Sequence, residues 1–354
     1  MKHIASTSLT LGALCIASLP AHAQSSVVLY GILDVGIEYA NHIPSGKTAS
    51  SALREESGNL AGSRWGLRGS EDLGGGYKAL FVLESGFNLN NGALGQGGRL
   101  FGRKAYVGIS TPYGTFTLGR HQNLIYELMY KYDAFTLNPS YSAQSMDSQF
   151  VNRADNSIRY GVTVSGLTFA ALYSNGFDST IAGGAQVPGA SKVGREMSAA
   201  LLYDRGPFSL GLTFDQLQGT SIATQSATQN RTLLGASYDL GFVKTLAGIR
   251  WLDTRNAEAP PSSVIYWGGL MFRISAPLLV SVAVYHTQFR HPHNGPTMGA
   301  LLVDYALSKR TELYAEAAYV NNRSYSDVGI RGTGVDVTTG ANQTGVTLGI
   351  RHAF

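Results

Sequence analysis

The residue types that could carry out catalysis are present, but they are not arranged in a catalytic motif. No nucleophile motif surrounds any serine, and His291 and His293 stand in a polar segment without an acidic partner nearby. Nucleophilic catalysis needs a base beside the nucleophile and an orienting group behind that base. The sequence therefore does not favour an enzyme and indicates no cofactor, although weak surface metal binding by the two histidines is an alternative.

The charged residues are few and interspersed along the chain. There are 27 lysines and arginines, 23 aspartates and glutamates, 43 glycines and 19 tyrosines, and the mean hydropathy is −0.01. Basic residues do not gather into a patch, so we expect no nucleic-acid partner. This composition is typical of an all-β protein with many turns. No linker composition divides the chain, so we expect one domain.

The first 23 residues have the pattern of a secretory signal peptide. Lys2 precedes an apolar run that is too short to span a bilayer as a helix, and Ala21 to Ala23 form a small-x-small cleavage site. We expect the mature chain to be residues 24–354. Cys15, the only cysteine, leaves with the signal; a lipid-attachment role is the alternative, but Leu14 occupies a place where that signal requires a small residue.

Segments that alternate apolar and polar residues follow one another along the mature chain. Residue 29 begins an apolar series with period two, and the same period recurs to the C-terminus. Such alternation predicts strands with one apolar and one polar face. We expect strands at 27–40, 62–72, 77–89, 100–111, 115–121, 156–164, 167–175, 193–204, 207–216, 231–239, 242–253, 263–273, 278–289, 297–307, 311–320 and 343–354.

The connections alternate strictly between seven short turns and eight longer loops, which makes 16 strands. An outer-membrane β-barrel has short periplasmic turns, long outer loops and an even strand number. It must close, because unpaired backbone groups in hydrocarbon cost several kcal/mol each. Aromatic residues near segment ends on the apolar face fit interfacial girdles, namely Tyr39, Tyr173, Tyr203, Tyr238, Trp251, Tyr305, Tyr319 and Phe354. We predict a 16-stranded antiparallel transmembrane barrel, wide enough to hold an aqueous channel.

Residues 123–153 break the strand pattern. Leu124, Ile125, Leu128 and Met129 recur at helical spacing, which predicts a short helix followed by an irregular return. A connection of this length inside a compact domain is generally functional or disordered. It is the third outer loop and, from its length, the only one expected to fold into the barrel and narrow it. Its tyrosines could form a sugar-stacking track, but packing of the loop on the wall is the favoured interpretation.

Several blocks together resemble the trimeric general diffusion porins of Gram-negative bacteria, especially the β-proteobacterial branch. These blocks are SRWGLRGSEDLG at 63–74, the strand at 79–88, FGRKAYVG at 101–108, 114–120 and the terminal RHAF at 351–354. The resemblance implies a homotrimer in the outer membrane, in contact with lipid and lipopolysaccharide, and passive diffusion of ions and small hydrophilic solutes. It also implies that the barrel-assembly machinery reads the terminal Phe354.

Members of this family set basic side chains on the wall against carboxylates on the inward loop. Carried over by position, the match gives Arg64, Arg103 and Arg159 for the wall, with Arg68 one step along the face of Arg64. Asp133 matches the acidic side of the loop, and Glu127 and Glu84 are further acidic candidates. Two positions depart from enterobacterial relatives: Ile32 stands where they place a lysine, and Thr136 to Pro139 replace their loop turn.

Opposed charges across a narrow opening orient polar solutes, and an excess of one sign attracts counter-ions. Four arginines set against Asp133, with Glu127 as a further carboxylate, predict a mild anion preference. Salt bridges that brace the loop against the wall are the alternative role for each arginine, weighed equally for Arg68 and Glu84. An outer-membrane barrel enzyme or an adhesin without an open pore is the alternative function, although nothing in the outer loops identifies a receptor.

Overall fold

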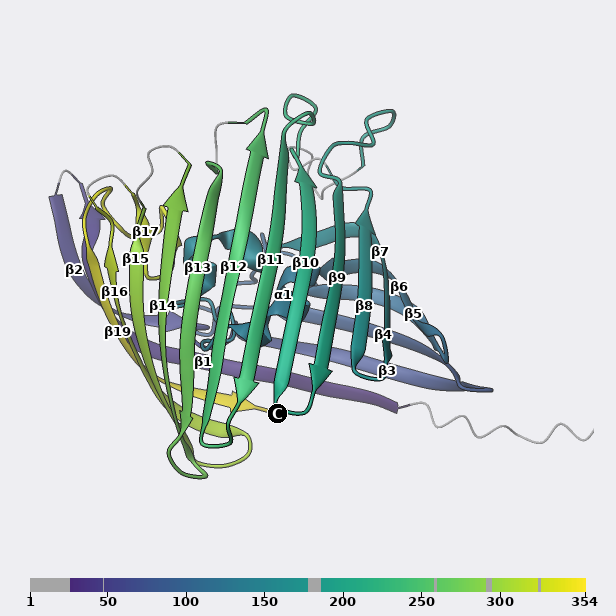
Figure 1. The fold of residues 1–354 in the computed structure, drawn as a ribbon, viewed down its shortest axis with the longest axis horizontal. Helices are drawn as coiled ribbons and strands as arrows, with labels where there is room; N and C mark the ends of the chain where they lie inside the picture. Colours follow the sequence, from purple (N-terminus) through teal and green to yellow (C-terminus); the bar gives the residue numbers. More distant parts are fainter. Residues whose placement is uncertain (1–25, 47, 178–185, 258–259, 291–294, 324–325) are drawn as a thin grey trace, which may run out of the picture.

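The structure is a computed structural model that describes residues 26–46, 48–177, 186–257, 260–290, 295–323 and 326–354. The predicted signal peptide and the two histidines at 291 and 293 lie outside these residues. One antiparallel sheet curves round and closes on itself, with short turns at one end and longer connections at the other (Figure 1). Within the described ranges, no helix is both long and apolar enough to cross a membrane.

The strands of the sheet follow one another in chain order, each paired with its neighbour. Their bounds are β1 Ser26–Ser45, β2 Thr48–Ser57, β3 Arg64–Gly74, β4 Tyr77–Gly86, β5 Lys104–Thr111, β6 Gly114–Gln122, β7 Arg153–Val164, β8 Leu167–Ser174, β9 Glu196–Arg205, β10 Phe208–Gln218, β11 Thr228–Asp239, β12 Val243–Arg255, β13 Ser263–Arg273, β14 Leu278–Phe289, β15 Thr297–Ala306, β16 Thr311–Asn321 and β19 Gln343–Ala353.

The barrel closes because β1 pairs with β19 on one side and with β2 and β3 on the other. β2 pairs with the outer part of β1, from Val35 onward, and β3 pairs with its beginning, up to Ile32. β2 and β3 therefore share one position in the barrel, and the 17 strands of the sheet occupy 16 positions. The predicted 16-stranded antiparallel barrel is confirmed.

The predicted alternation separates the two faces of the wall. Outward side chains such as Leu212, Leu348 and Val107 are exposed on the outer surface, where the bilayer lies. Their sequence neighbours point inward and carry the polar and charged groups. Most of the aromatic residues predicted at the girdles, Tyr39, Trp251 and Tyr319 among them, are exposed, whereas Tyr203 is half-buried.

The polar loop expected at 41–61 contains strand instead. β1 continues to Ser45, and Thr48–Ser57 returns along it as β2. The sequence hides this hairpin because Leu53 is the only large apolar residue of β2, so apolar alternation gives no signal there. At the end of β2 the chain enters the lumen, where Asn59 and Ala61 donate their backbone N–H groups to the Asp34 carboxylate at 3.3 and 2.7 Å.

Residues 123–153 lie inside the barrel (Figure 1). They form α1 (Leu124–Met129), the 3-10 helix η1 (Tyr130–Tyr132), α2 (Ala143–Met146) and the 3-10 helix η2 (Ser148–Val151). The predicted short helix is therefore confirmed. Three of the four have a side-chain N-cap: Asn123, Ser142 and Asp147 accept hydrogen bonds from the first turns of α1, α2 and η2, whereas η1 continues directly from α1.

A second outer connection also folds inward, which corrects the expectation that only residues 123–153 would do so. The last outer loop, residues 322–342, forms the short hairpin β17 (Val328–Gly329) and β18 (Gly332–Thr333). Val328 and Ile330 are almost fully buried. The prediction relied on loop length alone. This shorter loop is held inside the barrel by contacts with residues far away in the sequence, which length does not reveal.

Candidate functional site

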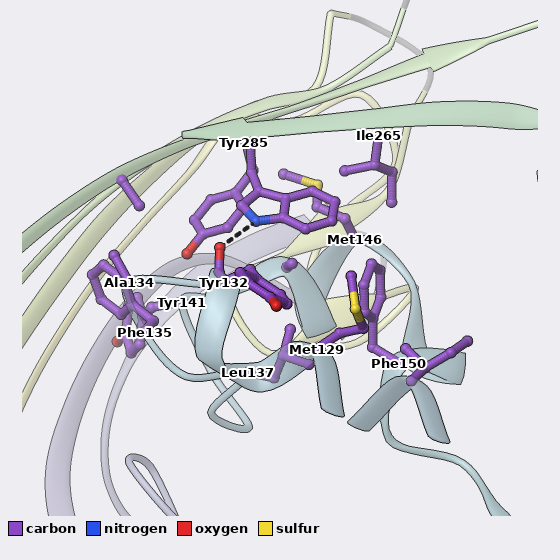
Figure 2. Packing of buried hydrophobic residues seen from close by; sticks show 14 of the residues in the cluster. Met129, Tyr132, Ala134, Phe135, Leu137, Tyr141, Met146, Phe150, Ile265 and Tyr285 are labelled. Atoms are coloured by element: carbon purple, nitrogen blue, oxygen red, sulfur yellow. Dashed lines mark hydrogen bonds between the residues drawn. The ribbon is translucent and has the colours of Figure 1, made fainter. Parts of the chain in front are cut away.

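The inward loop, residues 123–153, carries a buried apolar surface that faces the wall. Met129, Phe135, Leu137, Met146 and Phe150 are buried. Figure 2 shows them packed together with Ile265 of β13 and Tyr285 of β14. Burial of apolar side chains stabilises a fold by about 25 cal/mol per Å², so this cluster fixes the loop across the lumen instead of leaving it mobile at the mouth.

Tyr132 enters a slot made by two glycines. Gly211 and Gly235 are directly paired between β10 and β11, and a Cβ atom on either one would lie 2.6 Å from the Tyr132 ring. The Tyr132 hydroxyl makes a 2.9 Å hydrogen bond with Ser209, and the Trp267 indole N–H donates to the Tyr132 carbonyl at 2.8 Å. The tyrosine therefore packs the loop on the wall, as the favoured interpretation of the loop tyrosines predicted.

Replacing Gly235 by alanine should displace Tyr132 and weaken the attachment of the loop. Overpacking of this kind costs typically about 1–3 kcal/mol. The measurement is the free energy of unfolding of the variant in detergent. Gly268→Ala is the matched control, because a Cβ atom there has its nearest neighbour at 3.9 Å. Equal stability of the two variants would contradict the slot.

The structure corrects the placement expected for Asp133. This residue is 0% exposed, so its carboxylate presents no surface to the lumen. It accepts hydrogen bonds from the Tyr285 hydroxyl at 2.6 Å and from the backbone N–H groups of Phe135 and Ala143 at 2.9 and 3.1 Å. Burial raises the pKa of Asp133, and these hydrogen bonds oppose that rise. Asp133 holds the return of the loop together instead of lining an opening.

Asp147 attaches the second half of the loop to β11 and β12. Its carboxylate lies 2.9 Å from Arg231 Nε of β11 and 3.3 Å from Arg250 Nε of β12. Burial raises the pKa of Asp147, but the two guanidinium groups outweigh burial and leave it below its ordinary value. Two residues earlier in the loop contact other strands: Asn138 donates to Glu316 of β16 at 2.6 Å, and the Tyr141 hydroxyl lies 2.8 Å from Thr347 Oγ1 of β19. The loop is thus bound to strands on both sides of the barrel.

The predicted basic residues of the early strands meet on the inner wall around Glu84. Arg103 Nε lies 2.7 Å from Glu84 Oε1, and Arg64 Nε lies 4.0 Å from Glu84 Oε2. The Tyr30 hydroxyl donates to the same carboxylate at 2.9 Å. Glu84 therefore lies on the wall with the arginines and not opposite them. Arg68, on the same face of β3, is exposed and stacks over the Tyr30 ring at 5.3 Å.

Arg159 of β7 bridges the wall and the loop. Its Nε donates to Glu127 Oε2 at 2.9 Å, and its Nη2 contacts Glu127 Oε1. The side chains remain 16% and 36% exposed, so the pair both braces α1 and presents charge to water. Bidentate arginine–carboxylate pairs have a fixed geometry, so this pair is a well-defined contact between the basic wall and the acidic loop, and unlike the Asp147 contacts it is partly exposed.

Four basic residues of this region were missed by the sequence reasoning. Lys104 is paired across the strands with Glu84 and lines a cavity of about 190 Å³ with Tyr106, Glu127 and Arg159. Its place directly after Arg103 in the FGRKAYVG block, in phase with Tyr106, could have revealed it. The others lie nearer the outer end: Arg120 and Arg99 contact Asp155, Arg99 at 2.7 Å, and Arg153 lies beside them.

Phe354 lies at the seam of the barrel. Its backbone N–H donates to the Gly31 carbonyl at 3.1 Å and its carbonyl accepts from Gly31 at 3.0 Å. The ring covers Gly31, where a Cβ atom would lie 2.3 Å from the ring edge.

Among the residues that the structure describes, no group of three or more His, Cys, Asp or Glu side chains is placed to hold a metal ion.

Comparison with known proteins places this architecture in a family. A family model described as Gram-negative porin matches residues 7–325. An outer membrane porin protein of Bordetella pertussis is 33% identical and covers 94% of this chain and 96% of that protein. Outer membrane porin protein 32 of Delftia acidovorans is 32% identical and covers 97% of this chain and 98% of that protein. A solved anion-selective porin from Comamonas acidovorans is 28% identical, with a TM-score of 0.80 over 94% of this chain and 100% of that one.

These matches agree with the barrel and confirm the resemblance to porins of the β-proteobacteria. The family consists of channels and not of enzymes. The chain belongs to the Gram-negative porin family, and it is a β-barrel porin of the outer membrane.

Proposed function

We propose that the barrel holds a water-filled channel for passive diffusion of ions and small hydrophilic solutes, with residues 123–153 as its constriction loop. The observation that carries this proposal is the Arg159–Glu127 contact, where a charged wall meets a charged loop inside the barrel. Water and solutes that pass this level experience a transverse field. Apolar solutes are opposed there because they cannot replace the hydration of these charges.

The charges at this level favour anions. Five basic side chains face the lumen against the two carboxylates of Glu84 and Glu127, the five being Arg64, Arg68, Arg103, Lys104 and Arg159. A lumen with an excess of positive charge concentrates anions and repels cations. The two carboxylates offset part of this positive charge, so the preference is mild. The anion selectivity of the Comamonas porin supports this direction.

The proposed assembly is a homotrimer. Porin homologues support it, including an outer membrane protein of Vibrio cholerae solved in a trimer form. We further propose that residues 1–23 are removed on export and that the barrel-assembly machinery reads Phe354, a residue that is 42% exposed at the seam. Outer-membrane lipid and lipopolysaccharide surround the apolar face.

Planar-bilayer recording tests the channel and its selectivity. We expect stepwise openings in groups of three and, across a salt gradient, a reversal potential that favours the anion. Cation preference would keep the channel but contradict the assigned charge balance. Correctly folded barrels that do not conduct would contradict the channel and favour an enzyme or adhesin. Migration of unheated and heated samples on a denaturing gel checks the trimer.

A further inference from the structure

The last outer loop, residues 322–342, contacts the constriction loop directly. The Ile330 carbonyl accepts hydrogen bonds from the Tyr141 backbone N–H at 2.9 Å and from Ser145 Oγ at 2.8 Å. Thr333 Oγ1 donates to the Ser145 carbonyl at 3.4 Å. The tip of the β17–β18 hairpin therefore covers the α2 end of the constriction loop.

The same hairpin is seated against the wall. The Ile330 side chain lies over Gly345 of β19, where a Cβ atom would be 2.2 Å from Ile330 Cδ1. The Ile330 backbone N–H donates to Gln343 Oε1 at 2.9 Å. A larger residue at 345 would leave no room for Ile330, so the wall and the hairpin are complementary in shape.

A charge network holds the next residue of the hairpin to β1 and β2. Arg331 Nε donates to Glu38 Oε2 at 2.9 Å, and its Nη2 donates to Asn59 Oδ1 at 2.6 Å. Arg54 of β2 contacts Glu38 Oε1 and Asp336 Oδ2, both at 2.8 Å. Glu38 is fully buried and lies between the two guanidinium groups. The hairpin is thus fixed on one side to α2 and on the other to the wall.

We propose that residues 328–336, hereafter the inner hairpin, form a latch that sets the open cross-section of the channel, with Arg331 as its positioning residue. This inference rests on the proposed diffusion channel. The inner hairpin fills the sector between the constriction loop and the β19–β1–β2 wall. Its removal from that sector opens the sector to water and frees one support of the constriction loop.

Arg331→Ala should release the inner hairpin without unfolding the barrel. Glu38 keeps its contacts with Arg54, so the substitution does not leave a buried carboxylate without a cation. Asn59 keeps its bond to the Tyr314 hydroxyl at 2.9 Å. Arg323→Ala is the matched control, because Arg323 is an exposed arginine of the same loop and its loss changes the net charge equally.

Two measurements on the purified full-length trimer test the latch. We expect Arg331→Ala to raise the single-channel conductance above both the wild type and Arg323→Ala, and to speed cleavage of the last outer loop by proteinase K. Unchanged protection from the protease would contradict the role of Arg331. Faster cleavage with wild-type conductance would show that the inner hairpin does not limit the channel. A wild-type barrel that does not conduct contradicts the proposed channel instead.

A cross-link gives the reverse experiment. Cys15 lies in the predicted signal peptide, so cysteines introduced at Ser145 and Thr333 should be the only thiols of the mature chain. In the Arg331→Ala background, oxidation of this pair should return the conductance to the wild-type value, and reduction should raise it again. Conductance that stays high while the cross-link is shown to be complete would overturn the latch.

Discussion

Replacing Asp147 by asparagine should lower the free energy of unfolding by about 3 kcal/mol, the lower end of the range for breaking a buried ion pair. The side chains of Arg231 and Arg250 are 1% and 2% exposed, and both contact this carboxylate. Arg250 loses its ion-pair partner in the variant. Arg231 keeps Asp215 as its cross-strand neighbour, which is why the lower end of the range applies.

The contribution of Asp147 also depends on pH. Its pKa is lower in the folded protein than the ordinary value of 3.8, because the guanidinium groups outweigh the effect of burial. A group with a depressed folded pKa contributes stability that is fully present above its unfolded pKa and is lost as the pH falls through the folded value. The difference between wild type and Asp147→Asn should therefore be constant near neutral pH and shrink below pH 3.8.

Urea unfolding followed by tryptophan fluorescence measures this difference. Asp204→Asn is the control, since it removes the same charge from a contact of the inward loop, Lys131 Nζ to Asp204 Oδ1 at 2.6 Å. The Asp204 side chain is 47% exposed, and exposed pairs contribute only about 0.2–1 kcal/mol. Equal losses in the two variants would show that the Asp147 contacts do not hold the loop.

The barrel could be predicted because its environment is uniform along every strand. Lipid on one side and water on the other impose the same two-residue period from Val27 to Phe354, so local pattern and final position agree. The position of the inward loop was predictable for the same reason, as the longest break in that pattern. β2 was missed because it lies where this uniform pattern ends. Its sequence has only one large apolar residue, so it shows no apolar–polar alternation.

Side-chain positions inside the loop could not be read from the sequence. Asp133 and Glu127 are both acidic residues of one loop, yet their surroundings differ. The Asp133 carboxylate is buried and bonded to Tyr285, whereas the Glu127 carboxylate is partly exposed and bonded to Arg159. Those partners lie far along the chain, and no local period indicates which carboxylate each one meets. The inner hairpin was missed for the same reason, since Arg331 meets Glu38 only after the barrel closes.

Replacing Arg68 and Lys104 together by glutamine should strongly reduce the anion preference of the channel, because three basic side chains then face two carboxylates. Among the described residues, neither of them lies within 4.0 Å of a carboxylate, whereas Arg64, Arg103 and Arg159 do. Neither charge is therefore held in a direct ion pair, although Lys104 faces Glu84 across the strands and lines the same cavity as Glu127. Removing one such charge changes the energy of a passing ion by on the order of 1 kcal/mol, roughly fivefold in its local concentration.

The reversal potential across a salt gradient measures this change, at low ionic strength where screening is weak. Glu127→Gln is the control of opposite sign, because it frees Arg159 from its carboxylate and should strengthen the anion preference. If the double variant keeps the wild-type reversal potential while Glu127→Gln shifts it, selectivity arises at the paired arginines alone. If neither shifts it, the charges that select ions lie outside this part of the wall.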